Sequence, residues 1–404
     1  MKKSIYVLYL TIVAVLAAAT FIAENEGIDY AKEEIYGAWW FAALWTLLVT
    51  VGMFYIIRRK VRSIPTLLLH LSFVVILLGA FITHVSGIQG SIHLRKGSFS
   101  VFYNSEDGQQ RLPFAIRLDN FSVQLYTDNG NVADYISNIT IADMDHNILK
   151  QSSVSMNNIL EHKGWRFYQW SYDDDGMGAS LVINRDPLGI AVTYVGYILL
   201  FLSFGIVVVG RCRKIIARRR EMGRMTTLEK SLLWTASLLS SAIILFGAYF
   251  FVTQMCDTNP WIADMRPILN SPWLSVHVSI ISVAYLLLLL ALIVSVIALC
   301  GGNASRLMHI SLLMLYPAMS LLAAGIFIGA IWANVSWGNY WSWDPKEVWA
   351  LITMMIYAIA LHGKSIPCLR TPRVYHRFMA LAFLTILMTF FGVNYFLAGM
   401  HSYV

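Results

Sequence analysis

Residues 67–97 read LLLHLSFVVILLGAFITHVSGIQGSIHLRKG, and this stretch contains two patterns that indicate two kinds of structure. Its first half is almost entirely apolar, which is typical of a helix that crosses a hydrocarbon core of about 30 Å. Beyond His84 apolar and polar residues alternate, which is typical of a β-strand with one buried face. We therefore predict a membrane-spanning helix over 65–84 that leads into a small β-rich domain over 85–187.

Apolar runs of similar length recur on both sides of this stretch. The chain has 404 residues, of which 57% are hydrophobic and 13% charged, and its mean hydropathy is +0.61. These values are typical of polytopic helical membrane proteins, in which about 20 apolar residues make one crossing. The first run also has features of a signal sequence, but its length favours an uncleaved anchor. We predict about nine transmembrane helices, at 4–22, 38–57, 65–84, 188–210, 229–253, 274–300, 307–332, 346–362 and 375–398.

Basic residues cluster in short segments between the apolar runs and predict the orientation of the chain. The clusters at 58–62, 211–224 and 364–373 fall on one side when nine spans alternate, and the positive-inside rule assigns that side to the cytoplasm. The net charge is +7, and the basic residues lie between apolar runs. We therefore expect membrane lipid, and no nucleic acid, as a partner. We predict a multi-pass protein of a bacterial cytoplasmic (inner) membrane, with its N-terminus in the cytoplasm and its C-terminus on the periplasmic side.

The patterns divide the chain into membrane parts and one outer domain. FAIRLDNFSVQLY and DYISNITIAD alternate apolar and polar residues, and turn signals occur at 107–108 and 128–130. The predicted fold class is a polytopic α-helical membrane protein with a small extracytoplasmic β domain inserted between the third and fourth spans. The predicted parts are a three-span N-terminal part (1–84), the β domain (85–187), the fourth span (188–210), a cytoplasmic basic linker (211–228) and a five-span part (229–404).

Missing motifs argue against several functions. The cysteines form no CxxC pair, which argues against a thiol oxidoreductase and against a covalently held haem of the chain's own. A Walker motif, a GxGxxG fingerprint and a GxSxG elbow are all absent from the sequence. ATP-driven transport and serine hydrolysis therefore have no support.

A loop around residues 332–349, which includes WGNYWSWDPKEVW at 337–349, holds an unusual concentration of aromatic side chains. Tryptophan concentrates at membrane interfaces in general, yet an interfacial belt needs only one or two such residues at each helix end. We therefore predict a binding platform for a flat ligand. Asp344-Pro345-Lys346-Glu347 has the pattern of a helix start, so capping and a functional role of Asp344 both stay open. The platform residues are Trp332, Trp337, Trp341, Trp343 and Trp349.

Four of the ten histidines occupy positions where their ring nitrogens can act as ligands. His277 begins the sixth predicted span and His401 follows the ninth, so both flank the tryptophan loop on the outer side. His70 and His362 lie in the inner half of the third and eighth spans, where we expect buried side chains that face the bundle interior. A proton relay or a helix–helix hydrogen bond would explain the inner pair equally well. We expect structural or solvated roles for the others: His84, His93, His146, His162, His309 and His376.

Two histidines at each depth predict two bis-imidazole sites stacked across the membrane. Imidazole is a natural axial ligand of haem iron, and tryptophan faces suit a flat, apolar macrocycle. The expected metal ligands are therefore His70 and His362 at the inner site and His277 and His401 at the outer site. The cofactor or transported ligand that fits this arrangement is haem b.

At these residues the chain resembles the System II cytochrome c synthases of the CcsBA (ResB plus ResC) family. WGNYWSWDPKEVWAL is similar to the tryptophan-rich haem-handling signature, the WWD domain, of the ResC-like half. GVNYFLAGMHSYV matches the segment that carries the second outer histidine of that family. The stretch at 67–97, together with GWRFYQWSYDDDG and DPLGIAVTYVGY, resembles the ResB-like half. The resemblance covers roughly 1–210 for one half and 229–404 for the other.

The resemblance implies that haem is exported from the cytoplasmic side and attached by thioether bonds to the CxxCH segment of apocytochrome c outside. Such a chain would be a holocytochrome c synthase, a haem lyase of the carbon–sulfur lyase class. We expect His277, His401 and Asp344 to be its catalytic residues, and a thiol-reducing thioredoxin-like protein to be a further partner. Two alternatives stay open: a membrane electron-transfer protein with a permanent b haem, and a haem exporter or chaperone that delivers to a separate ligase.

Overall fold

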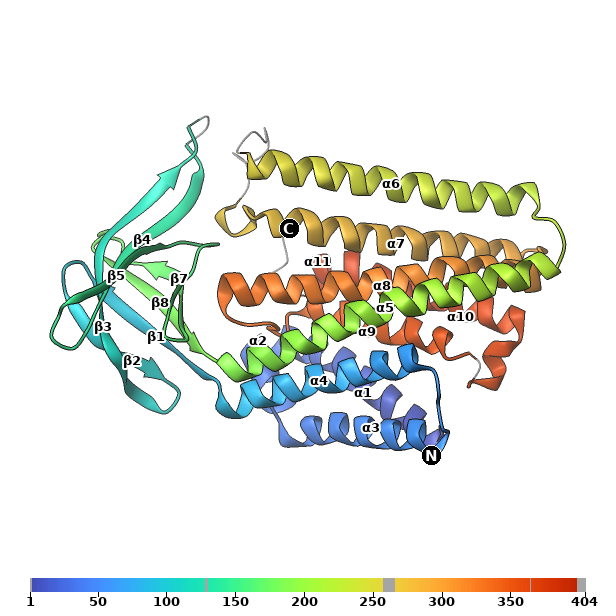
Figure 1. The fold of residues 1–404 in the computed structure, drawn as a ribbon, viewed down its shortest axis with the longest axis horizontal. Helices are drawn as coiled ribbons and strands as arrows, with labels where there is room; N and C mark the ends of the chain where they lie inside the picture. The colour runs from blue at the N-terminus through green and yellow to red at the C-terminus, as the bar shows by residue number, and fades with distance from the viewer. Residues whose placement is uncertain (1, 128–129, 257–265, 364, 398–404) are drawn as a thin grey trace.

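The computed structural model describes residues 2–127, 130–256, 266–363 and 365–397. Long helices that run along a common axis form one body, and a curved β-sheet adjoins one end of it (Figure 1). The chain forms three long helices, then the sheet, and then the remaining helices, which is the predicted order. The N-terminus lies at the end of the helical body remote from the sheet (Figure 1).

Two groups of helices make up the body. The first comprises the helices before the sheet and the one directly after it in the chain, and the second comprises all later helices. The first group is α1 (Lys2–Glu26), α2 (Ile28–Ala31), η1 (Lys32–Tyr36), α3 (Trp39–Arg58), α4 (Ile64–Ser86) and α5 (Pro187–Glu221). The second group is α6 (Thr227–Met255), η3 (Pro267–Leu269), α7 (Pro272–Leu299), α8 (Ala304–Trp337), α9 (Pro345–Leu361), η4 (Pro367–Arg370), α10 (Pro372–Leu387), η5 (Met388–Gly392) and α11 (Val393–Phe396).

Eight of the described helices are long and apolar enough to cross a membrane, which is the pattern of a multi-pass membrane protein. The prediction of about nine spans differs at 346–362, because this segment forms α9, whose 17 residues are at the lower limit for a crossing. α5 is longer than predicted, since it continues to Glu221 through a basic segment. More than half of the predicted linker over 211–228 is therefore helical.

The region between α4 and α5 forms one antiparallel sheet of eight strands in the order β5-β4-β3-β2-β1-β8-β7-β6. The first and last strands along the chain, β1 and β8, pair along their length, so the chain leaves and re-enters the helical body at adjacent points. The side of the membrane on which this sheet lies stays a prediction. The strands are β1 (Ile88–Arg95), β2 (Phe99–Ser105), β3 (Gly108–Leu125), β4 (Val132–Ala142), β5 (Ile148–Val154), β6 (Leu160–His162), β7 (Trp165–Tyr172) and β8 (Gly178–Arg185).

Small residues let α4 and α5 pack closely where they meet the sheet. A Cβ atom at Gly79 would collide with Thr193, and one at Gly196 would collide with Ile76. Asp186 caps α5 by accepting a hydrogen bond from the backbone N–H of Gly189 at 2.9 Å. This helix pair fixes the sheet to the helical body.

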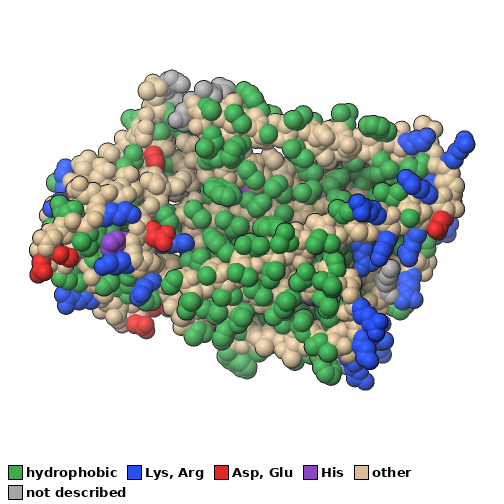
Figure 2. Space-filling view, in the orientation of Figure 1, with side chains coloured by type: hydrophobic (Ala, Val, Ile, Leu, Met, Phe, Trp, Pro, Cys, Tyr) green, Lys and Arg blue, Asp and Glu red, His purple; other side chains and the backbone are tan. Residues whose placement is uncertain are grey.

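The surface of the helical body is divided along its axis. Apolar side chains cover its middle, and Lys and Arg side chains gather at the end remote from the sheet (Figure 2). The positive-inside rule expects such a gathering at a cytoplasmic end. The distribution agrees with the predicted orientation, which itself stays a prediction.

Candidate functional site

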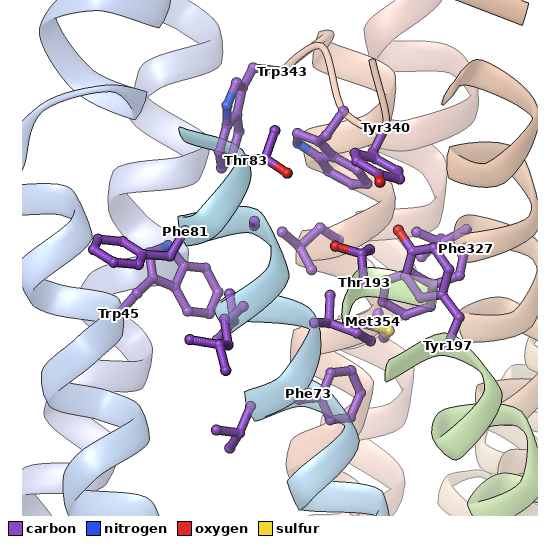
Figure 3. Close-up of a pocket in the computed structure, with 18 of the residues that line it drawn as sticks. Trp45, Phe73, Phe81, Thr83, Thr193, Tyr197, Phe327, Tyr340, Trp343 and Met354 are labelled. Atoms are coloured by element: carbon purple, nitrogen blue, oxygen red, sulfur yellow. The ribbon is translucent and has the colours of Figure 1, made fainter. Parts of the chain in front are cut away.

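A cavity of about 2810 Å³ contains both the inner histidine pair and the tryptophan loop among its lining residues. This volume exceeds the roughly 300–1,000 Å³ of an ordinary small-molecule pocket. Helices α1, α3, α4, α5, α8 and α9 all line it. Figure 3 shows Trp343 and Tyr340 at one end and Phe73 toward the other, with Trp45, Phe81 and Phe327 between. The cavity therefore offers a long, mostly apolar space for a large ligand.

His70 of α4 and His362, which follows α9, lie close together in this cavity. Their ring centroids are 6.1 Å apart, with the ring planes at 84°. In each ring Nδ1 lies against a backbone carbonyl one turn earlier in its own helix, Thr66 O at 2.7 Å and Ala358 O at 2.8 Å. A nitrogen that faces a carbonyl oxygen must carry the proton. Nε2 of each ring therefore keeps the lone pair that a metal ion needs.

The separation of the two imidazoles suits one shared iron. Metal–nitrogen bonds of about 2 Å on opposite sides of an ion place two ring centres roughly 6 Å apart. Among the described residues, no group of three or more His, Cys, Asp or Glu side chains is arranged to hold a metal ion. Two axial nitrogens are a ligand set that suits haem iron, since its other ligands belong to the macrocycle. The predicted burial of His362 is wrong, because α9 ends at Leu361 and the ring is exposed where it borders the cavity.

The tryptophan loop lies at the opposite end of α9. The predicted loop at 332–349 is shorter in the structure, because α8 continues to Trp337 and α9 begins at Pro345. His362 follows the last residue of α9, so the 17 residues of this helix separate it from the loop by about 26 Å. Two pairs of predicted platform residues line the cavity there. Trp332 and Trp337 have ring centroids 5.4 Å apart, and Trp341 and Trp343 have centroids 6.1 Å apart.

Trp349 is the platform residue that the fold places elsewhere. It belongs to α9, and its indole N–H donates to Thr20 Oγ1 of α1 at 3.1 Å. Its ring also meets Phe21 edge to face, with centroids 6.4 Å apart. Trp349 therefore joins α9 to α1 and does not line the cavity.

Four buried donors of the loop region have no hydrogen-bond partner among the described residues. They are the indole N–H groups of Trp332, Trp337 and Trp341 and the hydroxyl of Tyr340. Leaving a buried donor unpaired costs about 1–3 kcal/mol, so several in one place indicate an acceptor-bearing ligand. Haem has a flat apolar ring and carboxylate side chains, so it fits both the aromatic faces and these donors.

The backbone of the loop is strained at Trp343, whose φ is +57°. A bulky residue rarely adopts this conformation, and such strain is often found at functional sites. The indole of Trp343 stacks on Tyr36 of η1 with centroids 4.2 Å apart and planes at 7°. It also meets Phe41 edge to face at 5.8 Å. The N-terminal helices thus hold Trp343 in its strained position.

The β-sheet holds the start of the same loop. Asn334 of α8, which is fully buried, accepts from Arg166 Nη1 at 3.0 Å and donates to Gly338 O at 3.3 Å. Tyr168 donates to Asn334 O at 3.3 Å, and Asn184 donates to Gly338 O at 3.0 Å. Burial raises the pKa of Tyr168 to about 12, so its hydroxyl stays protonated and able to donate.

Asp344 begins α9 as predicted. Its side chain accepts a hydrogen bond from Lys346 N at 2.9 Å, and Pro345 occupies the first helical position. Glu347 Oε2 accepts from the backbone N–H of Ser342 at 2.9 Å. The two carboxylates therefore fix the turn between the tryptophan loop and α9.

His277 of α7 lies beside the tryptophan loop. Its Nδ1 is 2.8 Å from Gly325 O, and its ring centroid is 6.5 Å from that of Trp332. A Cβ atom at residue 329 would lie 2.8 Å from Cε1 of His277, so Gly329 leaves the room that the ring occupies. The proposed partner of this ring, His401, lies outside the described residues.

Several site residues were not predicted. Tyr36 and Asn334 have no sequence signal, because their importance arises from contacts between distant segments. Tyr340 lies inside the quoted loop and could have been included with the tryptophans. His84 lines the cavity although we expected a structural role, whereas His376 is fully buried and bonded to Ser295 Oγ and Ala304 O, as a structural histidine should be.

Comparison with known proteins gives two family matches that meet near α5. Residues 199–401 match the model of the family described as cytochrome C assembly protein. Residues 58–184 match the ResB-like family. The two matches together include every described residue of the cavity except those within 2–56 and a few around α5.

Individual relatives match about two fifths of the chain. Protein NrfI of Wolinella succinogenes is 36% identical over 181 residues, which are 41% of this chain and 20% of NrfI. Cytochrome c biogenesis protein CcsA of Guillardia theta is 30% identical over 205 residues, 43% of this chain and 68% of that protein. CcsA of Chlamydomonas reinhardtii is 32% identical over 187 residues, 43% of this chain and 50% of that protein. The chain belongs to the cytochrome c assembly protein family and carries a ResB-like region before the assembly region.

Proposed function

We propose that this protein carries haem from the inner side of a membrane to its outer side and attaches it to apocytochrome c there. The observation that carries the proposal is the single cavity that contains the His70–His362 pair and the tryptophan loop. Membership of the cytochrome c assembly family supports the same substrate. The chain would act as a holocytochrome c synthase, a haem lyase, in a bacterial inner membrane.

The proposed roles follow from where each side chain lies. His70 and His362 hold the iron of incoming haem b through their Nε2 atoms. Trp337, Trp341 and Trp343 support the ring at the outer end, and His277 with His401 holds the iron there. When bound, haem supplies the vinyl groups that react with the cysteine thiols of a CxxCH segment. The protein orients these groups and excludes water.

Asp344 and Trp349 have positioning roles in this proposal. Asp344 fixes the start of α9 through its bond to Lys346 N, and Trp349 fixes α9 to α1 through Thr20. A thiol-reducing thioredoxin-like protein would keep the CxxCH cysteines reduced outside. The sheet and the tryptophan loop would lie on the periplasmic side, with the N-terminus in the cytoplasm.

Co-expression with one CxxCH-containing apocytochrome, in cells that lack any other maturation system, tests the proposal. We expect covalent haem on the apocytochrome, detected after denaturing electrophoresis. His277→Ala should abolish it, with partial rescue by added imidazole. Haem that stays in this protein and accepts electrons from quinol would instead indicate an electron-transfer protein. Covalent product that appears only with a separate ligase would indicate an exporter.

A further inference from the structure

Consecutive helices α3 and α4 do not pack against each other, although only residues 59–63 connect them. α3 packs on α1 and η1, whereas α4 packs on α5. Both helices nevertheless line the cavity over most of their length. The wall of the cavity therefore has a gap between α3 and α4.

The gap is open at the depth of the histidine pair. Gly52 lies six residues before the end of α3 at Arg58, and His70 lies six residues after the start of α4 at Ile64. At about 1.5 Å per residue both positions are roughly 9 Å from the connection between the helices. A Cβ atom at Gly52 would meet nothing within 4 Å. The missing side chain thus leaves open space on the α3 side of the cavity, at about the depth of His70.

The residues that line the cavity on both sides of the gap are mostly apolar. Nearer the sheet, cavity-lining side chains of α4 keep large exposed fractions, with Leu78 51% and Phe81 62% exposed. Figure 3 shows Trp45 of α3 and Phe81 of α4 at one edge of the cavity. Between the ends of the helices the α3 and α4 linings include Val49, Met53, Phe73 and Leu77. Such walls favour a flat apolar ligand already dissolved in lipid over one that arrives from water.

We propose that the gap between α3 and α4 is a lateral entrance through which haem passes from the bilayer to the His70–His362 pair. The inference rests on the proposed function, since it takes haem as the ligand of that pair. It adds the source, which is the hydrocarbon of the inner half of the bilayer rather than the aqueous cytoplasm. Once haem is bound to the pair, it no longer contacts the residues of the entrance.

The test measures how fast haem enters and leaves the full-length protein in lipid nanodiscs. Haem b in phosphatidylcholine vesicles is the donor, haem-free vesicles are the acceptor, and the absorption of bis-imidazole haem reports occupancy. Gly52→Trp places a bulky side chain in the gap, at a position where an added Cβ atom meets nothing within 4 Å. An obstacle that bound haem does not touch raises the free-energy barrier equally for entry and for exit. We therefore expect both rates to slow by about tenfold, with an unchanged dissociation constant for haem.

Gly205→Trp is the matched control. Gly205 is also a helical glycine with nothing within 4 Å of an added Cβ, but it lies on α5 away from the cavity. Its rates should equal those of the parent. Gly52→Leu, a smaller obstacle, should slow both rates less than Gly52→Trp and covers the case in which the larger side chain prevents folding.

Three results would overturn the inference. Unchanged rates in Gly52→Trp would place the entrance elsewhere, such as the aqueous end near Val61. A raised dissociation constant with an unchanged entry rate would make Gly52 part of the binding site. A parent protein that binds no haem with bis-imidazole absorption would overturn the proposed function as well, and is distinguished from the other results because it needs no variant.

Discussion

The end of the cavity that holds the tryptophan loop depends on backbone conformations that few residues adopt. Gly338, where the tryptophan loop leaves α8, has a φ of +85°, and a Cβ atom there would lie 2.7 Å from the ring of Tyr168. We expect Gly338→Ala to destabilise the protein by about 1–3 kcal/mol through backbone strain, with the steric clash in addition. Thermal unfolding in detergent measures this. Gly205→Ala, on an open helical face, should not lower Tm, and equal Tm values for the two variants would contradict the expectation.

Substitutions at Asp344 distinguish a structural role of its side chain from a chemical one. As the residue that caps α9, it should tolerate Asn, because an amide oxygen can also accept the hydrogen bond from Lys346 N. Asp344→Ala should cost about 0.5–2 kcal/mol and lower the yield of holocytochrome. Asp344→Asn should restore both stability and yield. A well-folded Asp344→Asn variant without product would assign the carboxylate to the chemistry instead.

The sequence predicted which side chains lie close together where position along a helix was sufficient information. His70 lies near the start of its apolar run and His362 at the end of its run, so alternating spans bring both to the same depth. Trp349 could not be placed, since its rotation about α9 turns it toward Thr20 of α1. Tyr36 could not be found at all, because only the folded chain brings η1 against Trp343.

At the scale of elements, strands β7 and β8 hold the loop that follows α8. Arg166→Gln should remove the charged donor to Asn334, at a cost of about 1.5–3 kcal/mol. Hydrogen–deuterium exchange at 334–340 should become faster. Arg117→Gln is the control, because Arg117 pairs with Asp119 on the same sheet away from the loop. Unchanged exchange in Arg166→Gln would show that the sheet does not hold the loop.

The sheet should also lose stability in mild acid because of β6. Burial lowers the pKa of His162, with Lys163 and Lys150 adding to the effect, and its Nε2 has no hydrogen-bond partner among the described residues. The unfolded state then binds more protons than the folded state below its ordinary pKa of about 6.5. The protection factors of the sheet amides, which are corrected for the intrinsic pH dependence of exchange, should therefore fall as the pH falls through about 6.5.

His162→Gln tests this assignment. Glutamine does not titrate, so the variant should lose most of the pH dependence of the protection factors in β6 and β7. His146→Asn is the control, because His146 lies in an exposed turn and asparagine tolerates its φ of +67°. An identical pH dependence in the parent and in His162→Gln would mean that another group is responsible.

Elements were predicted best where length and hydropathy act alone. The alternation after His84 gave the sheet, and the apolar runs gave the long helices, because burial of an apolar face determines both. α9 ends after 17 residues, just before the predicted inner histidine. α5 continues through its basic segment, since arginine and lysine are good helix formers and nothing in 211–221 ends a helix.

For the whole molecule, the cavity is the feature that sequence patterns could not predict. It exists because α3 packs on α1 and α4 packs on α5, whereas consecutive helices usually pack together. Its walls come from both family regions and from the N-terminal helices, so neither region alone would enclose it. The cavity joins the histidine pair to the tryptophan loop. The simplest interpretation is that haem follows one route between them.

The yield of holocytochrome from a protein without the inner pair measures whether that route is used. The double variant His70→Ala/His362→Ala is compared with His309→Ala, in which the lost ring also bonds a carbonyl of its own helix, Ser305 O at 2.9 Å, but lies away from the cavity. We predict that the double variant loses both the bis-imidazole spectrum of the inner site and covalent haem on the co-expressed apocytochrome, while His309→Ala keeps both. A full yield of holocytochrome from the double variant, at equal protein level, would contradict the route.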